Sequence, residues 1–169
     1  MESGQGPSTP SGPGTQPQRG QSQPPPQRER GALRRVLLLA NEAVSADAVL
    51  NQIVKLAGGE PAEVFVAAPA LTSSPLKHAA GDVDEAIETA RLRLDASLHA
   101  LREMGFAATG EIGDSDPNLA LEDAIRRFPA DEVVIATHPR GRSKWLEWDV
   151  IEKARSELAM CVTHVVVDV

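Results

Sequence analysis

Short apolar runs alternate with amphipathic stretches from Arg34 to the end of the chain. The first run, Val36-Leu37-Leu38-Leu39-Ala40, is apolar at every position, which is typical of a parallel strand buried on both faces. The next stretch has a helical period and Ser45 as its N-cap, and it ends at Gly58-Gly59. Its apolar positions are Val49, Leu50, Ile53, Val54 and Ala57. A strand followed by a helix is the repeating unit of an α/β fold.

The alternation continues along the chain. Further strands are predicted at 62–68, 106–112, 133–136 and, as the last, Val162–Asp168. Further helices are predicted at 84–104, 117–128 and 144–157, with Asp116 and Ser143 as N-caps of the last two. Because every connection is long enough for a helix, these elements predict a doubly wound, five-stranded parallel sheet with four helices.

Residues 1–32 differ in composition from the rest. Gly, Pro, Gln and Ser dominate, and few apolar residues are present to offset the entropy cost of ordering. We expect a disordered tail at 1–32 and one α/β domain at 33–169. The proline run in the tail is either part of a solvated extension or a ligand for an aromatic groove.

The composition excludes several function classes. With a net charge of −7 and a pI near 5.1, the chain is not expected to bind nucleic acid. No apolar run approaches the roughly 20 residues that span a bilayer, so we expect no membrane partner and a cytoplasmic location. The single cysteine, Cys161, excludes an internal disulfide and fits a reducing compartment; we expect it to be a buried packing thiol.

The candidate site is the stretch D-E-V-V-I-A-T-H-P-R-G-R-S-K, Asp131 to Lys144, which joins a strand to a cationic turn. If the first and fourth strands are neighbours, their carboxyl ends form a switch point, where α/β sheets bind ligands. The predicted site residues are Asn41, Thr137, His138, Arg140, Gly141, Arg142, Ser143 and Lys144. The turn and the following helix N-terminus form either a seat for a small phosphorylated ligand or a solvated turn that compensates neighbouring acids.

No catalytic or metal-binding motif is evident. The sequence lacks G-x-x-x-x-G-K-[ST], G-x-G-x-x-G and H-E-x-x-H, and its histidines lack metal-ligand spacing. His164 is expected to be a satisfied or interface histidine, and Asp114 and Asp116 to serve turns and caps. The charged face of the helix at 84–104, including Arg93 and Arg102, is interpreted as solvated surface. The sequence therefore favours a protein that is not an enzyme.

Over 33–169 the chain resembles the universal stress protein family. The resemblance rests on V-L-L-L-A-N-E in the first strand, on G-D-S-D-P-N-L-A-L-E-D-A-I, and on V-V-I-A-T-H-P-R-G-R-S-K-W-L-E-W-D-V-I-E-K-A ahead of the strand V-T-H-V-V-V-D. It implies the strand order 3-2-1-4-5, frequent dimers through the last strand and roles in stress physiology. Some members of the family bind ATP and others do not.

The resemblance is weakest at the nucleotide motif. ATP-binding members carry G-x-x-G and a later Gly-Ser or Gly-Thr pair, whose backbone N–H groups approach the phosphates. Here Ala136 and Pro139 stand in place of the first two glycines, and Trp148-Asp149 stands about where the later pair would be. Pro139 has no N–H, and Ala136 adds a Cβ to the approach. Asn41 takes the place of an acidic residue that meets the nucleotide.

Three hypotheses follow. The favoured one is a non-enzymatic stress-protein-like domain that acts through a homodimer at Val162–Asp168 and through partner binding, with nucleotide binding weak or lost. An apolar edge strand without proline or lysine supports the pairing. The second is an adenine-nucleotide binder, with ATP as ligand and slow ATPase activity as an option. The third is an enzyme of the wider nucleotide-dependent α/β group, for which no catalytic residue is evident.

Overall fold

A five-stranded parallel sheet forms the centre of the molecule. The computed structural model describes residues 1, 33–40, 47–71, 80–139, 149–158 and 160–167. The strands are β1 (Arg34–Ala40), β2 (Ala62–Pro69), β3 (Ala107–Gly113), β4 (Glu132–Thr137) and β5 (Cys161–Val166). Their order, β3-β2-β1-β4-β5, confirms the predicted topology. Apart from Met1, the predicted tail at 1–32 lies outside the described residues.

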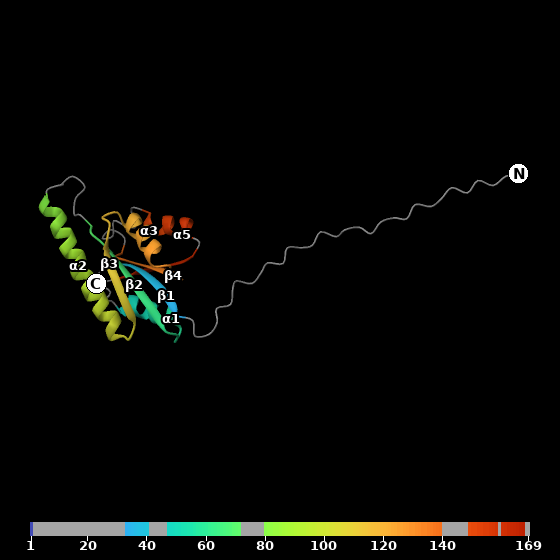
Figure 1. Ribbon diagram of the computed structural model, residues 1–169, viewed down its shortest axis with the longest axis horizontal. Coiled ribbons are helices and arrows are strands. Elements are labelled where there is room, and N and C mark those ends of the chain that lie inside the picture. Colours follow the sequence, from blue (N-terminus) through green and yellow to red (C-terminus); the bar gives the residue numbers. More distant parts are fainter. Residues whose placement is uncertain (2–32, 41–46, 72–79, 140–148, 159, 168–169) are drawn as a thin grey trace.

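Four described helices cover the two faces of the sheet (Figure 1). They are α1 (Asp47–Ala57), α2 (Ala80–Glu103), α3 (Pro117–Arg127) and α5 (Val150–Glu157). Buried side chains of α1 and α2 pack on one face of the sheet, and those of α3 and α5 pack on the other. This arrangement confirms the doubly wound α/β class predicted from the alternation.

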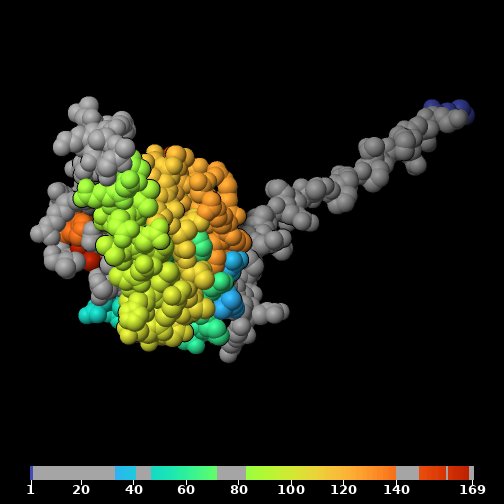
Figure 2. Space-filling view, turned by 60° about the vertical axis from the view of Figure 1, so that its left-hand side comes forward, coloured from blue at the N-terminus to red at the C-terminus, as the bar shows by residue number. Residues whose placement is uncertain are grey.

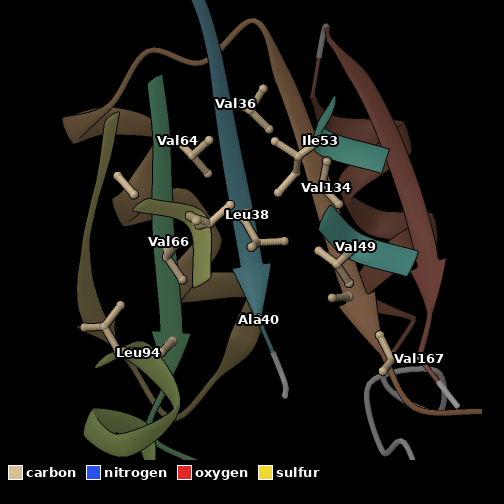
Figure 3. Close-up of a cluster of buried hydrophobic side chains, with 14 residues drawn as sticks. Val36, Leu38, Ala40, Val49, Ile53, Val64, Val66, Leu94, Val134 and Val167 are labelled. Carbon is tan, nitrogen blue, oxygen red and sulfur yellow. The ribbon is translucent and has the colours of Figure 1, made fainter. Parts of the chain in front are cut away.

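Strand β1 supplies both halves of the core. Successive strand residues point to opposite faces, so Val36 and Leu38 join the core under α1 and α2, while Leu37 and Leu39 join the core under α3 and α5. Figure 3 shows the first of these cores, with β1 between β2 and β4. These four side chains have no exposed surface. Each contributes roughly 1.5–3 kcal/mol relative to an exposed position.

Reciprocal backbone and side-chain contacts hold the amino ends of β1 and β4 together. Arg35 N–H donates to Asp131 Oδ2 at 2.9 Å, and Asp131 N–H donates to the Arg35 carbonyl at 2.8 Å. The Arg35 guanidinium lies 4.2 Å from the centre of the Phe128 ring, which stacks on Phe65 at 5.3 Å. Asp131 and Phe128 thereby tie the segment that precedes β4 to the central strand.

The start of α3 follows the sequence prediction. Asp116 is the N-cap, and its Oδ1 accepts a hydrogen bond from Asn118 N–H at 2.8 Å. Pro117 occupies the first helical position, where no N–H is required. Asp114 Oδ1 accepts from Asp116 N–H at 2.8 Å, which closes the preceding turn. Both aspartates therefore have the turn and capping roles expected of them.

The prediction of one continuous helix over 144–157 is wrong. Asp149 has φ 51° and ψ 24°, in the left-handed region, and α5 begins only at Val150. A left-handed residue cannot continue a right-handed helix, and Asp is among the few non-glycine residues that tolerate this conformation. Residues 144–148 and the predicted cap Ser143 lie outside the described residues.

Cys161 is exposed, so its predicted burial is wrong. It begins β5, which is an edge strand and pairs only with β4 in the described sheet. An apolar sequence run does not distinguish an edge strand from a central one, because burial depends on the neighbouring elements.

Gly110 allows β3 to approach both β2 and α2. A Cβ at this position would overlap the Val66 carbonyl oxygen and lie 2.8 Å from Leu94 Cδ1. We predict that Gly110→Ala lowers the free energy of unfolding by roughly 1–3 kcal/mol, the usual cost of overpacking. Urea denaturation measures the change. Ala107→Ser, at an exposed position of the same strand, is the control and should stay within about 0.5 kcal/mol of the wild type. Equal stabilities of the two variants would contradict the close approach.

Candidate functional site

The carboxyl ends of β1 and β4 meet at the centre of the sheet. Ala40 pairs with Ala136, and from this pair the chain winds toward opposite edges. The predicted switch point is therefore present, at the position where α/β sheets bind ligands. The segments 41–46 and 140–148 lie outside the described residues. The same holds for the predicted site residues Asn41, Arg140, Gly141, Arg142, Ser143 and Lys144.

Thr137 ends β4, and its side chain is fully buried. Its Oγ1 lies 2.7 Å from His164 Nε2, and its carbonyl accepts a hydrogen bond from Val167 N–H at 2.8 Å. Both contacts join β4 to β5 and the residue that follows it. The Thr137 hydroxyl thus has a partner inside the domain.

His164 is the polar side chain of β5 that reaches β4. It is partly buried, and loss of hydration lowers the pKa of His164 from its ordinary value of 6.5. The positive charge of Arg155 in α5 lowers this pKa further. Both effects disfavour the imidazolium, so His164 is neutral at pH 7. The expectation of a satisfied histidine is confirmed by its contact with Thr137.

Apolar side chains fill the α1 side of the switch point. Ala136 and Val167 are 1% and 2% exposed, and both belong to the core that includes Ala40 and Val49. Figure 3 shows Val167 beside Val49 at the carboxyl end of the sheet. His138 follows β4 directly and is partly buried. The described rim is therefore mainly apolar, and most of the polar groups predicted for the site belong to segments outside the described residues.

Asp149 brings a negative charge to the start of α5. It is exposed, and its side chain makes no capping hydrogen bond to the helix. Its positive φ lies in the left-handed region, which glycine adopts without strain and Asp tolerates. A carboxylate at this position opposes the attraction of the helix N-terminus for an anion.

Arg93 has a structural contact that the sequence analysis missed. Its Nη1 donates to the carbonyl of Pro69, the last residue of β2, at 3.1 Å. Ser97 is fully buried one turn later, and its hydroxyl donates to the Arg93 carbonyl at 2.7 Å. The interpretation of Arg93 as solvated surface is therefore wrong. The sequence did contain a signal for the burial of Ser97, because Ser97 is spaced three residues after Leu94 and four before Leu101 on the buried face of the helix.

The described residues show few other features of a small-molecule site. A hollow between α3 and α5, lined by Leu121, Lys153 and Leu158 among others, has a volume of about 20 Å³, enough for one water molecule. Within the described ranges, no three His, Cys, Asp or Glu side chains gather in a way that could hold a metal ion. None of the described helices is long and apolar enough to cross a membrane.

Solved structures of universal stress proteins share this fold. A family member from Burkholderia pseudomallei has 17% identity and a TM-score of 0.52, over 77% of this chain and 93% of that chain. A universal stress protein from Archaeoglobus fulgidus has 19% identity and a TM-score of 0.52, over 79% and 98%. A family protein from Arabidopsis thaliana, solved with AMP bound, has 14% identity and a TM-score of 0.50, over 80% and 92%.

Neither a family model nor a curated protein sequence matches the chain significantly. The structural similarity, at these identities, establishes the fold alone: the chain has the universal stress protein fold. The resemblance found in the sequence is thus confirmed at the level of architecture.

The lowered pKa of His164 predicts a pH dependence of stability. Because the unfolded chain binds this proton more readily, the stabilisation from neutral His164 is fully present above pH 6.5 and is lost as the pH falls through the lower folded-state pKa. Urea unfolding from about pH 8 to about pH 5 measures the effect. His164→Gln should weaken the dependence, whereas Thr163→Ser, on the same strand, should retain it. A pH profile unchanged by His164→Gln would contradict the assignment.

Proposed function

We propose that this chain is a non-enzymatic, universal-stress-protein-like domain that acts in stress response through dimerisation and partner binding, with nucleotide binding weak or lost. The observation that carries the proposal is the edge strand β5, which carries no fixed charge and, among the described strands, pairs only with β4 of a universal stress protein fold. The single cysteine supports a reducing, cytoplasmic location.

Strand β5 has the composition of an interface strand. Its sequence is C-V-T-H-V-V, without proline, lysine or any acidic residue, and Val166 is 44% exposed. An unprotected edge of this kind pairs readily with another strand. Two copies of β5 related by a two-fold axis would run antiparallel, and their edge backbone groups would bond to each other. The same pairing would cover Val166.

Two described positions support weak nucleotide binding. Pro139 offers no N–H, and Asp149 places a carboxylate at the start of α5. ATP-binding members of the family carry glycine in this motif. Fewer available N–H groups and an added negative charge both weaken the attraction for phosphates.

The alternative function is adenine-nucleotide binding, with slow ATP hydrolysis as an extension of it. The Arabidopsis thaliana protein of this fold was solved with AMP bound, and this chain has the cations Arg140, Arg142 and Lys144 after β4. In this alternative, the cationic turn supplies the phosphate contacts that glycine N–H groups supply elsewhere, and Asn41, Thr137, His138, Gly141 and Ser143 complete the site.

We predict that ATP does not bind the wild-type chain with a Kd below ~100 μM, which corresponds to a free energy of about −5.5 kcal/mol. Trp145 and Trp148, the two tryptophans, follow the cationic turn, and the chain has no tyrosine, so intrinsic fluorescence is a suitable signal. Equilibrium dialysis is the independent check.

The matched variant is Pro139→Gly combined with Asp149→Gly. Restored N–H access and removal of the carboxylate should tighten ATP binding by at least about tenfold, or ~1.4 kcal/mol. Saturable binding by the wild type below the stated concentration would instead establish the alternative function. Phosphate release that requires Arg140 and Arg142 would identify the chain as an ATPase.

We predict that the wild-type chain is a dimer at micromolar concentration and that Val166→Lys makes it monomeric. The new lysine would place a charge on the paired edge, where it would lose hydration. Light scattering after size-exclusion chromatography measures the mass. Leu92→Lys is the control, because Leu92 is 63% exposed on α2, which packs on β2 and β3. A wild-type chain that is only monomeric would refute the proposed pairing.

A further inference from the structure

The two edges of the sheet differ in their protection. At the β3 edge, the Arg102 guanidinium from α2 donates from Nε and Nη2 to the Ala108 carbonyl, at 3.1 and 2.8 Å. Ala108 belongs to β3, so a charged side chain is bonded directly to the backbone of this edge strand. Arg102 lies on the exposed face of the helix, as the sequence predicts, and its guanidinium in addition bonds to the edge strand. Figure 2 shows α2 running the height of the molecule beside the β3 and α3 part of the chain.

A second arginine reaches β3 from the opposite face of the sheet. Arg127, in the last turn of α3, pairs through Nη1 with Glu111 Oε2 of β3. Helices α2 and α3 pack on opposite faces, so Arg102 and Arg127 flank the same edge strand from both sides. The side chain of Arg127 is 63% exposed. Any strand that docked along β3 would compete with Arg102 for a backbone acceptor and would remove water from both cations.

The β5 edge has no comparable protection among the described residues. None of its side chains carries a fixed charge, and His164 is neutral and bonded to Thr137 of β4. Two ways of joining copies through this edge exist in principle. Pairing of β5 with β5 is isologous and closes as a dimer, whereas pairing of β5 with β3 of another copy is heterologous and adds further copies in a ring or a filament.

We propose that Arg102 and Arg127 block the β3 edge and so restrict strand pairing to β5, which makes a closed dimer the end point of assembly. This inference rests on the proposed pairing through β5. It assigns the two arginines a role in selecting the strand with which β5 pairs. Pairing of β5 with the β5 strand of a second copy is allowed, and pairing of β5 with the β3 strand of a second copy is prevented. Without the arginines, both edges would accept strands, and the assembly would grow with concentration.

The test compares the wild type with the double variant Arg102→Ala/Arg127→Ala by sedimentation velocity over a wide concentration range. The wild type should not exceed the dimer. The double variant should show a weight-average mass that passes the dimer and rises with concentration, while circular dichroism confirms that it is folded. The charge-retaining variant Arg102→Lys/Arg127→Lys should remain a dimer. Arg127→Ala alone changes an exposed side chain, so it should fold and show a smaller rise in mass.

Addition of Val166→Lys identifies the surface that the larger species use. In the triple variant, β5 is blocked, so species larger than the wild-type dimer should disappear. Their persistence would show that they form through another surface and would overturn the inference. A double alanine variant with the size distribution of the wild type would also overturn it, whatever that size is. A monomeric wild type is a separate result, which refutes the proposed β5 dimer.

Discussion

The pairing of β1 with β4 determines most of the architecture. These strands are far apart in sequence, yet they lie side by side with Val36 opposite Glu132 and Ala40 opposite Ala136. Burial of β1 on both faces stabilises the pair, and the reciprocal Arg35–Asp131 hydrogen bonds hold its amino end. With these two strands at the centre, the remaining crossovers must wind toward opposite edges. The switch point, the two helical layers and the two different edges all follow from this pairing.

The two ends of the β1–β4 pair have different chemistry. At the amino end, Arg35, Asp131 and the stacked ring of Phe128 form a network that joins the chain before β4 to β1. At the carboxyl end, the described side chains are mainly apolar, and Thr137 is bonded to His164. A universal stress protein fold therefore persists here with a described rim that offers few groups to a phosphate.

Arginine placement explains why part of the structure could not be predicted. A helical pattern assigns Arg93 and Arg102 to the polar face of α2, and the backbone of both residues lies on that face. Their long apolar stems let the guanidinium reach the carbonyls of Pro69 and Ala108 at the ends of neighbouring strands. Which carbonyl is within reach depends on the packing of α2 on the sheet. No local sequence pattern records that distance.

The sequence alone determined the order of strands and helices, the double burial of β1 and the capping of α3 by Asp116, because these follow from local periodicity and from short-range hydrogen bonds. It also predicted the strand order, through the family resemblance. Only the tertiary structure decided that Cys161 is exposed, that Thr137 bonds His164, and that arginines flank one edge of the sheet. These features depend on which elements become neighbours and how closely they pack, which local periodicity does not record.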